Sequence, residues 1–424
     1  MELSAGLGAR TAAQTILREV LHRRRPLDAV LGAMTHLDVR DAGFARAIAS
    51  ETLRRFGQLE VLIRQFVPKP LDRNRAGATT EILLAGACEL LFLDVPAHAA
   101  VDAANRLAMA DGKAKHFKAL INAVLRRVAR DGRAIIDTQD APRLNTPHWL
   151  WQRWCESFGE ETARAIAATH LGVAPVDVVV KGVPPPEGVL LYGDVFRLGA
   201  HARIDTLEGY TEGDWWVQDA AASLPARLLG NVRGREVIDL CAAPGGKTAQ
   251  LAARGARVTA VERDGVRMER LKENLQRLKL EANLVVGDAR DVQLDGPAPF
   301  VLLDAPCSAT GTIRRHPELP WIKGNNDVTL CAAAAGELLD RAAEMTAEGG
   351  VLVFAVCSLE PEEGPEQIAS FLSRNARFER LRVMPEELFG RRDWIDANGD
   401  LRTLPCHLAD GMDGFYAARL TKIL

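Results

Sequence analysis

The sequence predicts a multidomain protein with an all-helical N-terminal domain, a small α+β segment and a C-terminal α/β domain built on a doubly wound parallel sheet. At 424 residues the chain exceeds what one hydrophobic core usually serves. Apolar residues recur at three- and four-residue spacing in the first 140 positions, and after residue 231 short apolar strands alternate with helical segments. We therefore predict domains at 1–141, 142–230 and 231–424.

The N-terminal domain is expected to consist of amphipathic helices. Ala13, Leu17 and Val20 lie on one face of a first helix at 9–21. Pro26 and Pro96 stand in breaks between helices, because proline lacks the N–H that a continuing helix needs. Further helices are expected at 43–56, 59–67, 77–92, 97–110 and 114–130, and an aromatic-rich helix is expected around 149–154.

Strands are expected in the rest of the chain. The middle segment carries a β-branched run at 176–180 and strand-like pieces near 189–197 and 215–218. In the C-terminal domain, strands are predicted at 236–240, 257–262, 283–286, 300–304 and 351–356. Because helical segments separate these five strands, they should be parallel neighbours in one sheet.

Positive charge is concentrated at the N-terminus. The first 140 residues hold 21 Lys and Arg against 16 Asp and Glu, although the whole chain has a net charge of −3. This excess predicts phosphate contacts with a nucleic acid, while solvated helix faces are the alternative explanation. The clusters comprise Arg23, Arg24 and Arg25, then Arg54 and Arg55, then Lys113, Lys115 and Lys118, and finally Arg126, Arg127, Arg130 and Arg133.

Composition argues against several classes of protein. The seven cysteines are scattered and include no C-x-x-C pair, so we expect reduced thiols and no metal. No apolar run approaches the roughly 18 residues of a membrane span, and residues 1–13 lack the apolar core of a secretory signal. The expectation is a cytoplasmic protein without membrane contact.

The run VIDLCAAPGGKT at 237–248 reads as a strand, a tight glycine loop and the start of a helix, which lets the backbone approach a ligand. A phosphate-binding P-loop needs glycine where Cys241 stands, and a dinucleotide-binding G-x-G-x-x-G is absent, so a nucleoside triphosphatase and a dehydrogenase are both disfavoured. Carboxylates follow the next three strands at Glu262, Asp288 and Asp304, on the rim where open α/β sheets bind ligands. A nucleoside-containing ligand is therefore predicted.

Two cysteines lie on the same rim. Cys307 comes just after the strand at 300–304, and Cys357 follows the strand at 351–356. A single cysteine is more often a small buried apolar residue than a reactive one. Neighbouring parallel strands should bring these two together at the ligand crevice, which favours a shared chemical role. Spacing alone does not decide which of them attacks a substrate.

Four motifs occur in order: DLCAAPGGKT at 239–248, LDAPCSATG at 303–311, RRHP at 314–317 and CSLEPEE at 357–363. By these motifs the chain resembles the bacterial 16S ribosomal RNA cytosine-C5 methyltransferases of the RsmB (Fmu, Sun) type. The first 140 residues, with VPAHAAV and INAVLR at 95–101 and 121–126, resemble that family's helical domain, which is similar to the antitermination factor NusB. The resemblance covers nearly the whole chain.

The resemblance implies a Rossmann-like class I domain that transfers a methyl group from S-adenosylmethionine to carbon 5 of a cytosine. Carbon 5 is a poor nucleophile until a thiolate adds to carbon 6, so a cysteine is required. By the family pattern Cys357 is this nucleophile, Cys307 assists release of the adduct, and Asp304 hydrogen-bonds the base near N3. Positive charge favours a thiolate, and Lys247 is a candidate to supply it.

The resemblance also implies a set of cofactor contacts. Glu262 stands where the family more often has aspartate and would bind the ribose hydroxyls, Asp288 would lie beside the adenine, and Asp264 is a weaker candidate. The remaining implied cofactor contacts are Cys241, Ala242, Ala243, Pro244, Gly245, Gly246, Lys247 and Asp304.

Three positions depart from the family pattern. Val179 and Lys181 stand in a stretch that usually carries an arginine, so the supporting contact of that arginine to RNA or to the active site is not expected in this chain. Ala335 stands where glutamine is common. The catalytic motifs are intact.

The substrate implied by the resemblance is small-subunit ribosomal RNA, with the target cytosine unpaired or flipped because stacking hides carbon 5. We expect a monomer that does not act on DNA. Two alternatives stay open. A DNA cytosine methyltransferase would use Cys307, in its Pro-Cys setting, as the nucleophile. A non-catalytic RNA-binding protein would have no use for the paired thiols.

Overall fold

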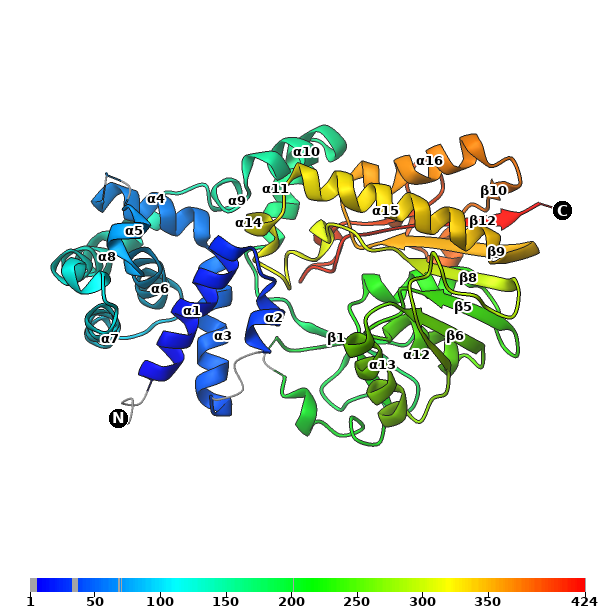
Figure 1. The fold of residues 1–424 in the computed structure, drawn as a ribbon, viewed down its shortest axis with the longest axis horizontal. Coiled ribbons are helices and arrows are strands. Elements are labelled where there is room, and N and C mark those ends of the chain that lie inside the picture. The colour runs from blue at the N-terminus through cyan, green and yellow to red at the C-terminus, as the bar shows by residue number, and fades with distance from the viewer. Residues whose placement is uncertain (1–5, 33–36, 68, 70, 201, 424) are drawn as a thin grey trace. The chain divides into compact units, whose positions relative to one another are not determined.

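The computed structural model describes residues 6–32, 37–67, 69, 71–200 and 202–423 (Figure 1). The chain divides into two compact units. The first comprises residues 1–171 together with 315–324, and the second comprises 172–314 together with 325–424. In the described part of the chain, no helix combines the length and the apolar character that crossing a membrane requires.

The first unit is helical, as predicted. Its centre is α6 (Thr79–Phe92), in which Ile82, Leu83 and Cys88 are buried in one apolar cluster. The neighbouring helices contribute Leu59, Val101 and Leu125 to the same cluster. The other helices are α1 (Leu7–Arg23), α2 (Leu27–Leu31), α3 (Val39–Arg54), α4 (Phe56–Phe66), α5 (Arg73–Ala76), α7 (Ala97–Ala110), η1 (Ala114–Phe117), α8 (Lys118–Ile136), α9 (Ala141–Leu144), α10 (His148–Phe158), α11 (Glu160–Thr169) and α14 (Leu319–Ile322).

The helical unit extends beyond the boundary predicted at residue 141. Arg54 and Arg55 donate hydrogen bonds to the carbonyl oxygens of His170 and Leu171, at 3.1 and 3.0 Å. At Gly57 a Cβ atom would lie 1.8 Å from the Leu144 carbonyl oxygen, so only glycine permits this approach of α4 to α9. The predicted middle subdomain, 142–230, is therefore divided, and its first thirty residues belong to the helical unit.

A short segment of the C-terminal half also belongs to the helical unit. The Trp321 ring lies 4.7 Å from that of Phe56, and its Nε1–H donates to the Leu53 carbonyl oxygen at 2.9 Å. The backbone N–H of Leu27 donates to Glu318 at 3.2 Å. Sequence patterns did not reveal this insertion, because it depends on contacts between residues nearly 300 positions apart.

The second unit contains two sheets. The smaller is antiparallel, with strand order β2-β3-β1-β4. Its strands are β1 (Val176–Val180), β2 (Val189–Tyr192), β3 (Val195–Leu198) and β4 (Trp215–Val217). The larger has strand order β10-β12-β9-β8-β5-β6-β7, and β11 pairs with β12 off this path. Its strands are β5 (Glu236–Leu240), β6 (Arg257–Glu262), β7 (Asn283–Val286), β8 (Ala298–Asp304), β9 (Thr346–Val356), β10 (Phe378–Arg380), β11 (Leu401–Thr403) and β12 (Phe415–Lys422).

The sheet continues beyond the five predicted parallel strands with antiparallel strands at one edge. All five predicted strands are present and parallel, but β12 runs antiparallel to β9, and β10 and β11 run antiparallel to β12. These three strands follow α16 with only short 3-10 helices between them, so the alternation of strands with α-helices that signals parallel pairing is missing there.

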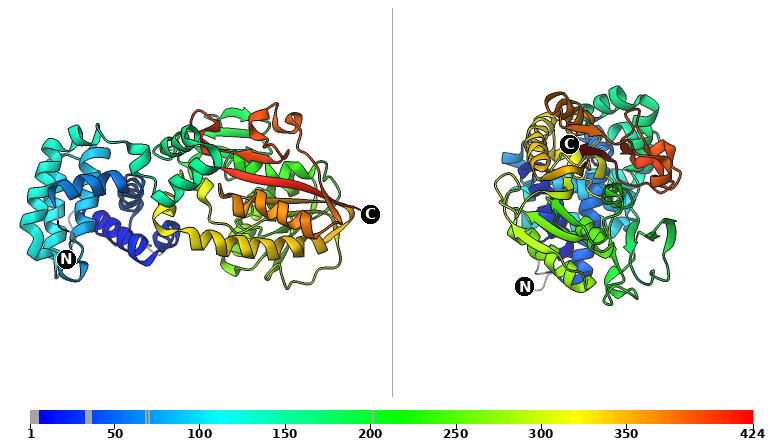
Figure 2. Two further views of the ribbon diagram at one scale, coloured as in Figure 1. Left: turned by 90° about the horizontal axis from the view of Figure 1, so that it is seen from above. Right: turned by 90° about the vertical axis from the view of Figure 1, so that its right-hand side faces the viewer.

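Helices cover both faces of the large sheet. Figure 1 shows α12 (Gly246–Ala253) and α13 (Gly265–Leu278) on one face, with α15 (Asn325–Glu344) and α16 (Pro365–Arg374) on the other. The further views show α15 running alongside α16 (Figure 2). Along β8, Leu302 joins the core on the α12 side, whereas Val301 and Leu303 join the core on the α15 side, as alternation in a strand requires.

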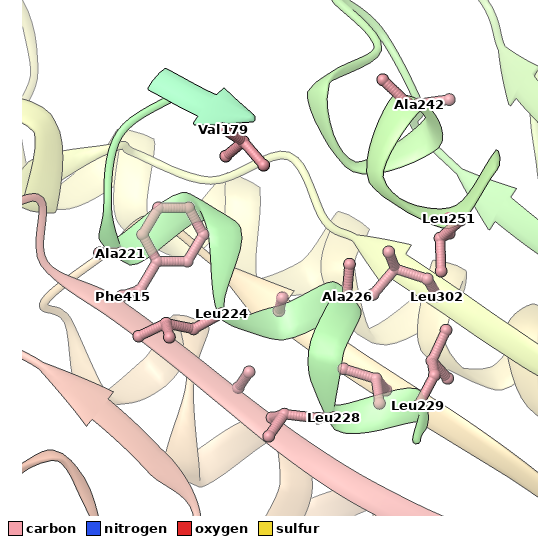
Figure 3. Close-up of a cluster of buried hydrophobic side chains, with 14 of the residues drawn as sticks. Val179, Ala221, Leu224, Ala226, Leu228, Leu229, Ala242, Leu251, Leu302 and Phe415 are labelled. Carbon is pink, nitrogen blue, oxygen red and sulfur yellow. The ribbon is translucent and has the colours of Figure 1, made fainter. Parts of the chain in front are cut away.

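The small sheet shares its core with the large one. Figure 3 shows one buried cluster that includes Val179 from β1 and Phe415 from β12. Leu224, Leu251 and Leu302 belong to the same cluster. Val179 is thus a packing residue. This continuity explains why residues 172–230 form one unit with the C-terminal sheet.

Candidate active site

The predicted site residues gather at the carboxyl ends of β5 to β9, around a cavity of about 220 Å³. Parallel strands end at one edge of a sheet, which is why residues from distant motifs meet there. The predicted residues that line the cavity are Cys241, Ala243, Glu262, Asp288, Asp304, Cys307 and Cys357. Lys247 does not line the cavity itself but donates a hydrogen bond to Asp304, which does. Ala242, Pro244, Gly245 and Gly246 belong to the same loop but do not line the cavity.

A larger cavity of about 860 Å³ lies at the opposite, amino ends of β5, β6 and β7. It arises because residues 287–297, between β7 and β8, form no helix to cover that part of the sheet. None of the predicted site residues lines it, and we place the chemistry in the smaller cavity, where the reactive groups converge.

Cys307 and Cys357 are direct neighbours, with their sulfur atoms 3.4 Å apart. Pairing of β8 with β9 continues to Asp304 opposite Ala355, and the Ala305 N–H donates to the Ala355 carbonyl oxygen at 2.9 Å. The Gly311 N–H then donates to the Cys357 carbonyl oxygen at 3.0 Å. Backbone hydrogen bonds on both sides thus hold the two cysteine loops together.

The surroundings of Cys307 favour its protonated form. The pKa of Cys307 is raised well above its usual range by its hydrogen bond with Cys357, by burial, and by the negative charges of Cys357 and Glu363. Either sulfur can donate in the contact between them, and the raised pKa of Cys307 favours Cys307 as the donor.

Lys247 and Asp304 form an ion pair beside the cysteines. The Lys247 ammonium donates to Asp304 Oδ2 at 2.7 Å and lies 5.0 Å from the centre of the Phe415 ring. Burial alone would lower the pKa of Lys247, but the Asp304 carboxylate outweighs it, and the pKa is raised. Lys247 therefore stays positively charged near Cys357.

Glu262 is a buried carboxylate in the cavity wall, 3% exposed. Its two oxygens accept hydrogen bonds from the backbone N–H groups of Asp264, at 3.0 Å, and Ala243, at 3.3 Å. Arg267, which sequence reasoning missed, lines the cavity and lies 3.5 Å from Glu262. The Asp264 side chain instead caps α13 by accepting from Val266 and Arg267 N–H groups.

Asp288 is already paired. Arg290 donates to both of its oxygens, at 2.9 and 2.7 Å, and lowers the pKa of Asp288 to about 2. Arg290 also donates to Glu337 of α15 at 2.9 Å, which ties the β7 end to that helix. Two of the departures from the family pattern can also be placed. Ala335 belongs to α15 and is fully buried in the core that this helix covers. Lys181 directly follows β1 and is exposed.

The residues around the cavity fit a nucleoside cofactor. Carboxylates at the ends of adjacent strands suit ribose hydroxyls and a purine edge, and the glycine loop admits a close approach of the backbone. Glu262 would bind the ribose, and Asp288 with its partner Arg290 would border the base. The fold and this donor set define a class I S-adenosylmethionine-dependent methyltransferase joined to a helical domain.

Comparisons with known proteins specify the class further. Residues 226–421 match the family described as 16S rRNA methyltransferase RsmB/F, and residues 7–130 match the NusB family. Ribosomal RNA small subunit methyltransferase B of Serratia proteamaculans is 33% identical over 436 residues, covering 98% of both chains. The protein of the same name from Pseudomonas putida is 34% identical over 445 residues, covering 98% of this chain and 99% of the relative. The chain belongs to the RsmB/F family of 16S rRNA methyltransferases.

Solved structures support the fold. The crystal structure of PH0851 aligns over 100% of both chains with a TM-score of 0.74 and 22% identity. NSun6 from Pyrococcus horikoshii, solved with SFG, covers 66% of this chain and 98% of its own, with a TM-score of 0.55 and 18% identity. At these identities the likeness concerns the fold alone.

Proposed function

We propose that the protein methylates carbon 5 of a cytosine in small-subunit ribosomal RNA through a covalent Cys357 adduct, and that Cys307 assists release. One observation carries the proposal. The two sulfurs lie 3.4 Å apart beside the cavity at the carboxyl ends of the strands, where burial and nearby negative charge raise the pKa of Cys307. The relatives named for small-subunit ribosomal RNA support this substrate, which would place the enzyme in the cytoplasm. We keep the monomer as an expectation from the sequence.

In the first step the Cys357 sulfur adds to carbon 6 of the cytosine, and the electrons of the C5–C6 double bond move towards carbon 5 and N3. N3 becomes more basic as the adduct forms. Lys247 and Asp304 can place a shared proton at N3, because Lys247 occupies one Asp304 oxygen and leaves the other to face the base. S-adenosylmethionine, when bound, supplies the methyl group that carbon 5 takes up.

In the second step the carbon 5 proton passes to water, and the electron pair of the C5–H bond re-forms the C5–C6 double bond as the bond between carbon 6 and Cys357 breaks. The proton on N3 returns to the Lys247–Asp304 pair. The electron pair of the bond between carbon 6 and sulfur returns to the Cys357 sulfur. The Cys307 thiol lies within hydrogen-bond reach of this sulfur and can stabilise the departing thiolate by donating to it. A protonated Cys307 is thus suited to release, whereas it is unsuited to attack.

Substitution of each cysteine tests the order of the roles. Cys357→Ala should lower methyl transfer about 10³-fold or more, because no nucleophile remains. Cys307→Ala should instead accumulate a protein–RNA adduct that survives a denaturing gel. Methyl transfer is measured by bisulfite sequencing of ribosomal RNA from a deletion strain that carries each variant.

The opposite pattern would support the alternative order. If Cys357→Ala trapped an adduct and Cys307→Ala did not, Cys307 would be the nucleophile, as in DNA cytosine methyltransferases. If neither variant changed methylation, the covalent mechanism would be wrong. Failure to bind S-adenosylmethionine in calorimetry would favour a non-catalytic RNA-binding role.

A further inference from the structure

One buried carboxylate joins the two cysteine loops. Each cysteine is followed by a serine, and both serine hydroxyls donate to Glu363 Oε2, at 2.6 Å from Ser308 and in a short bond from Ser358. The Ser308 backbone N–H donates to the other oxygen, Oε1, at 2.7 Å. Glu363 thereby accepts three hydrogen bonds from the residues adjacent to Cys307 and Cys357.

The surroundings of Glu363 are closed to solvent. Glu363, Ser308 and Ser358 each have no exposed surface. Thr310 adds a cross-link, because its hydroxyl lies 3.3 Å from that of Ser358 and accepts from the Leu359 N–H at 3.0 Å. A buried, fully hydrogen-bonded network of this kind rigidifies the groups that it joins.

Backbone contacts hold the far side of the Cys357 loop. Arg402 of β11 donates to the carbonyl oxygens of Ser358 and Leu359, both at 2.8 Å. The Glu360 N–H donates to the Ser358 hydroxyl at 3.0 Å. The Cys357 loop therefore has its polar groups committed before any substrate arrives.

The charge of Glu363 bears on the cysteines as well. Burial raises the pKa of Glu363, and the hydrogen bonds from Ser308 and Ser358 oppose that shift. A carboxylate here adds to the causes that raise the pKa of Cys307, after Cys357 and burial. Other charged groups around this cluster are Glu360 beside Glu363 and Arg402, which donates to the Ser358 and Leu359 carbonyl oxygens. On the cavity side is the Lys247–Asp304 pair, in which Lys247 interacts electrostatically with Cys357.

We propose that Glu363 is a positioning residue for the reaction, which holds Cys307 and Cys357 at proton-sharing distance and keeps the proton on Cys307. The roles of the two sulfurs rest on the proposed function. We call the restraint that Glu363 places on the two cysteine loops the clamp, and it rests on the three hydrogen bonds that Glu363 accepts. It acts through the serines, since Glu363 does not line the cavity.

Two substitutions separate the geometry from the charge. Glu363→Gln keeps the shape and an acceptor for the Ser308 N–H but removes the charge, whereas Glu363→Ala removes both. We expect Glu363→Ala to lower kcat about 10²-fold, with the KM for S-adenosylmethionine changed less than about threefold, because misplaced reacting groups cost rate. Glu363→Gln should recover most of the loss. Asp400→Asn, which removes another buried carboxylate of the same unit, is the matched control.

Alkylation of Cys307 provides a readout that a merely structural role would not move. In the Cys357→Ser background, the rate of iodoacetamide labelling at Cys307 is followed against pH by peptide mass spectrometry. Removing a nearby negative charge favours the thiolate, so Glu363→Gln should shift this profile to lower pH by on the order of 1 unit. An unchanged profile would overturn the charge part of the proposal.

Oxidation by diamide measures the distance between the sulfurs without RNA or cofactor. Disulfide formation between Cys307 and Cys357 should slow about tenfold in Glu363→Ala. Ser358→Ala should also slow it while leaving Cys307 alkylation unchanged, because the carboxylate remains. Equal oxidation rates in all variants would overturn the clamp. If instead Cys357→Ala still methylates RNA, the proposed function fails, and these thiol measurements still decide the clamp.

Discussion

At the scale of single residues, Lys247 decides how charge is arranged around the cysteines. Sequence reasoning gave it two roles, as a cofactor contact and as a source of positive charge. In the structure its ammonium pairs with Asp304 at 2.7 Å and does not line the cavity, which favours the second role. We therefore treat the Lys247–Asp304 pair as one proton-carrying unit.

Lys247→Met tests this unit. The Asp304 carboxylate would lose its partner, and stabilisation of charge at the base would weaken, so single-turnover methyl transfer should fall about 10²-fold. Affinity for S-adenosylmethionine, measured by calorimetry, should change little. A large loss of affinity for S-adenosylmethionine with an unchanged rate of methyl transfer would show instead that Lys247 is a cofactor contact.

Asp239, at the end of β5, gives a prediction about pH. It is fully buried, accepts from the Thr248 hydroxyl at 2.6 Å, and burial raises its pKa to about 7. A carboxyl with a raised folded-state pKa favours folding most below its unfolded pKa of about 3.9, and this contribution is lost as the pH rises towards 7.

Thermal unfolding of the wild type and of Asp239→Asn should therefore diverge with pH. Between about pH 4 and 7 the melting temperature of the wild type should fall relative to that of the variant, because only the wild type must take up a proton at residue 239 when it folds. Other buried carboxyls titrate identically in both proteins, so the difference isolates Asp239. A constant difference across this range would contradict the assignment.

At the scale of elements, the inserted segment 315–324 is the feature that links distant parts of the sequence. It carries α14 and contacts α2, α3 and α4 through Glu318 and Trp321. The motif RRHP at 314–317 leads directly into it. A motif that sequence comparison associates with the catalytic half therefore enters the helical unit.

Trp321→Ala should destabilise the helical unit by about 2–4 kcal/mol, because it removes a large packed ring and a hydrogen bond to Leu53. Hydrogen exchange should increase in α3 and α4. Leu330→Ala, on the exposed face of α15 at 71% exposure, is the matched control and should have no effect. Equal exchange in the two variants would show that the segment does not support these helices.

At the scale of the whole molecule, the basic residues of the helical unit have two different uses. Arg54 is buried and donates to the His170 carbonyl oxygen, so its assignment to phosphate contact is wrong. Arg127 covers the Phe66 ring at 4.4 Å. Lys113, Lys115 and Lys118 are exposed and remain candidates for phosphate contact.

The salt dependence of RNA binding separates these uses. Replacing Lys113, Lys115 and Lys118 with Gln should weaken binding and reduce the slope of log affinity against log salt by roughly 0.7–0.9 per lost contact. The fold should be unaffected, as circular dichroism would check. Arg54→Gln should instead lower stability without a comparable change in slope. An unchanged slope in the triple variant would show that these three lysines do not contact phosphate.

The sequence by itself determined the local features of this protein. All five parallel strands, the helical character of the first unit and the meeting of Cys307 and Cys357 followed from periodicity and strand order, because these depend on neighbouring residues and on one sheet edge. The tertiary structure alone decided the antiparallel β12, the boundary near residue 171, the insertion of 315–324 and the link of Ser308 and Ser358 through Glu363. Each depends on contacts between residues far apart in the chain, which no local pattern records.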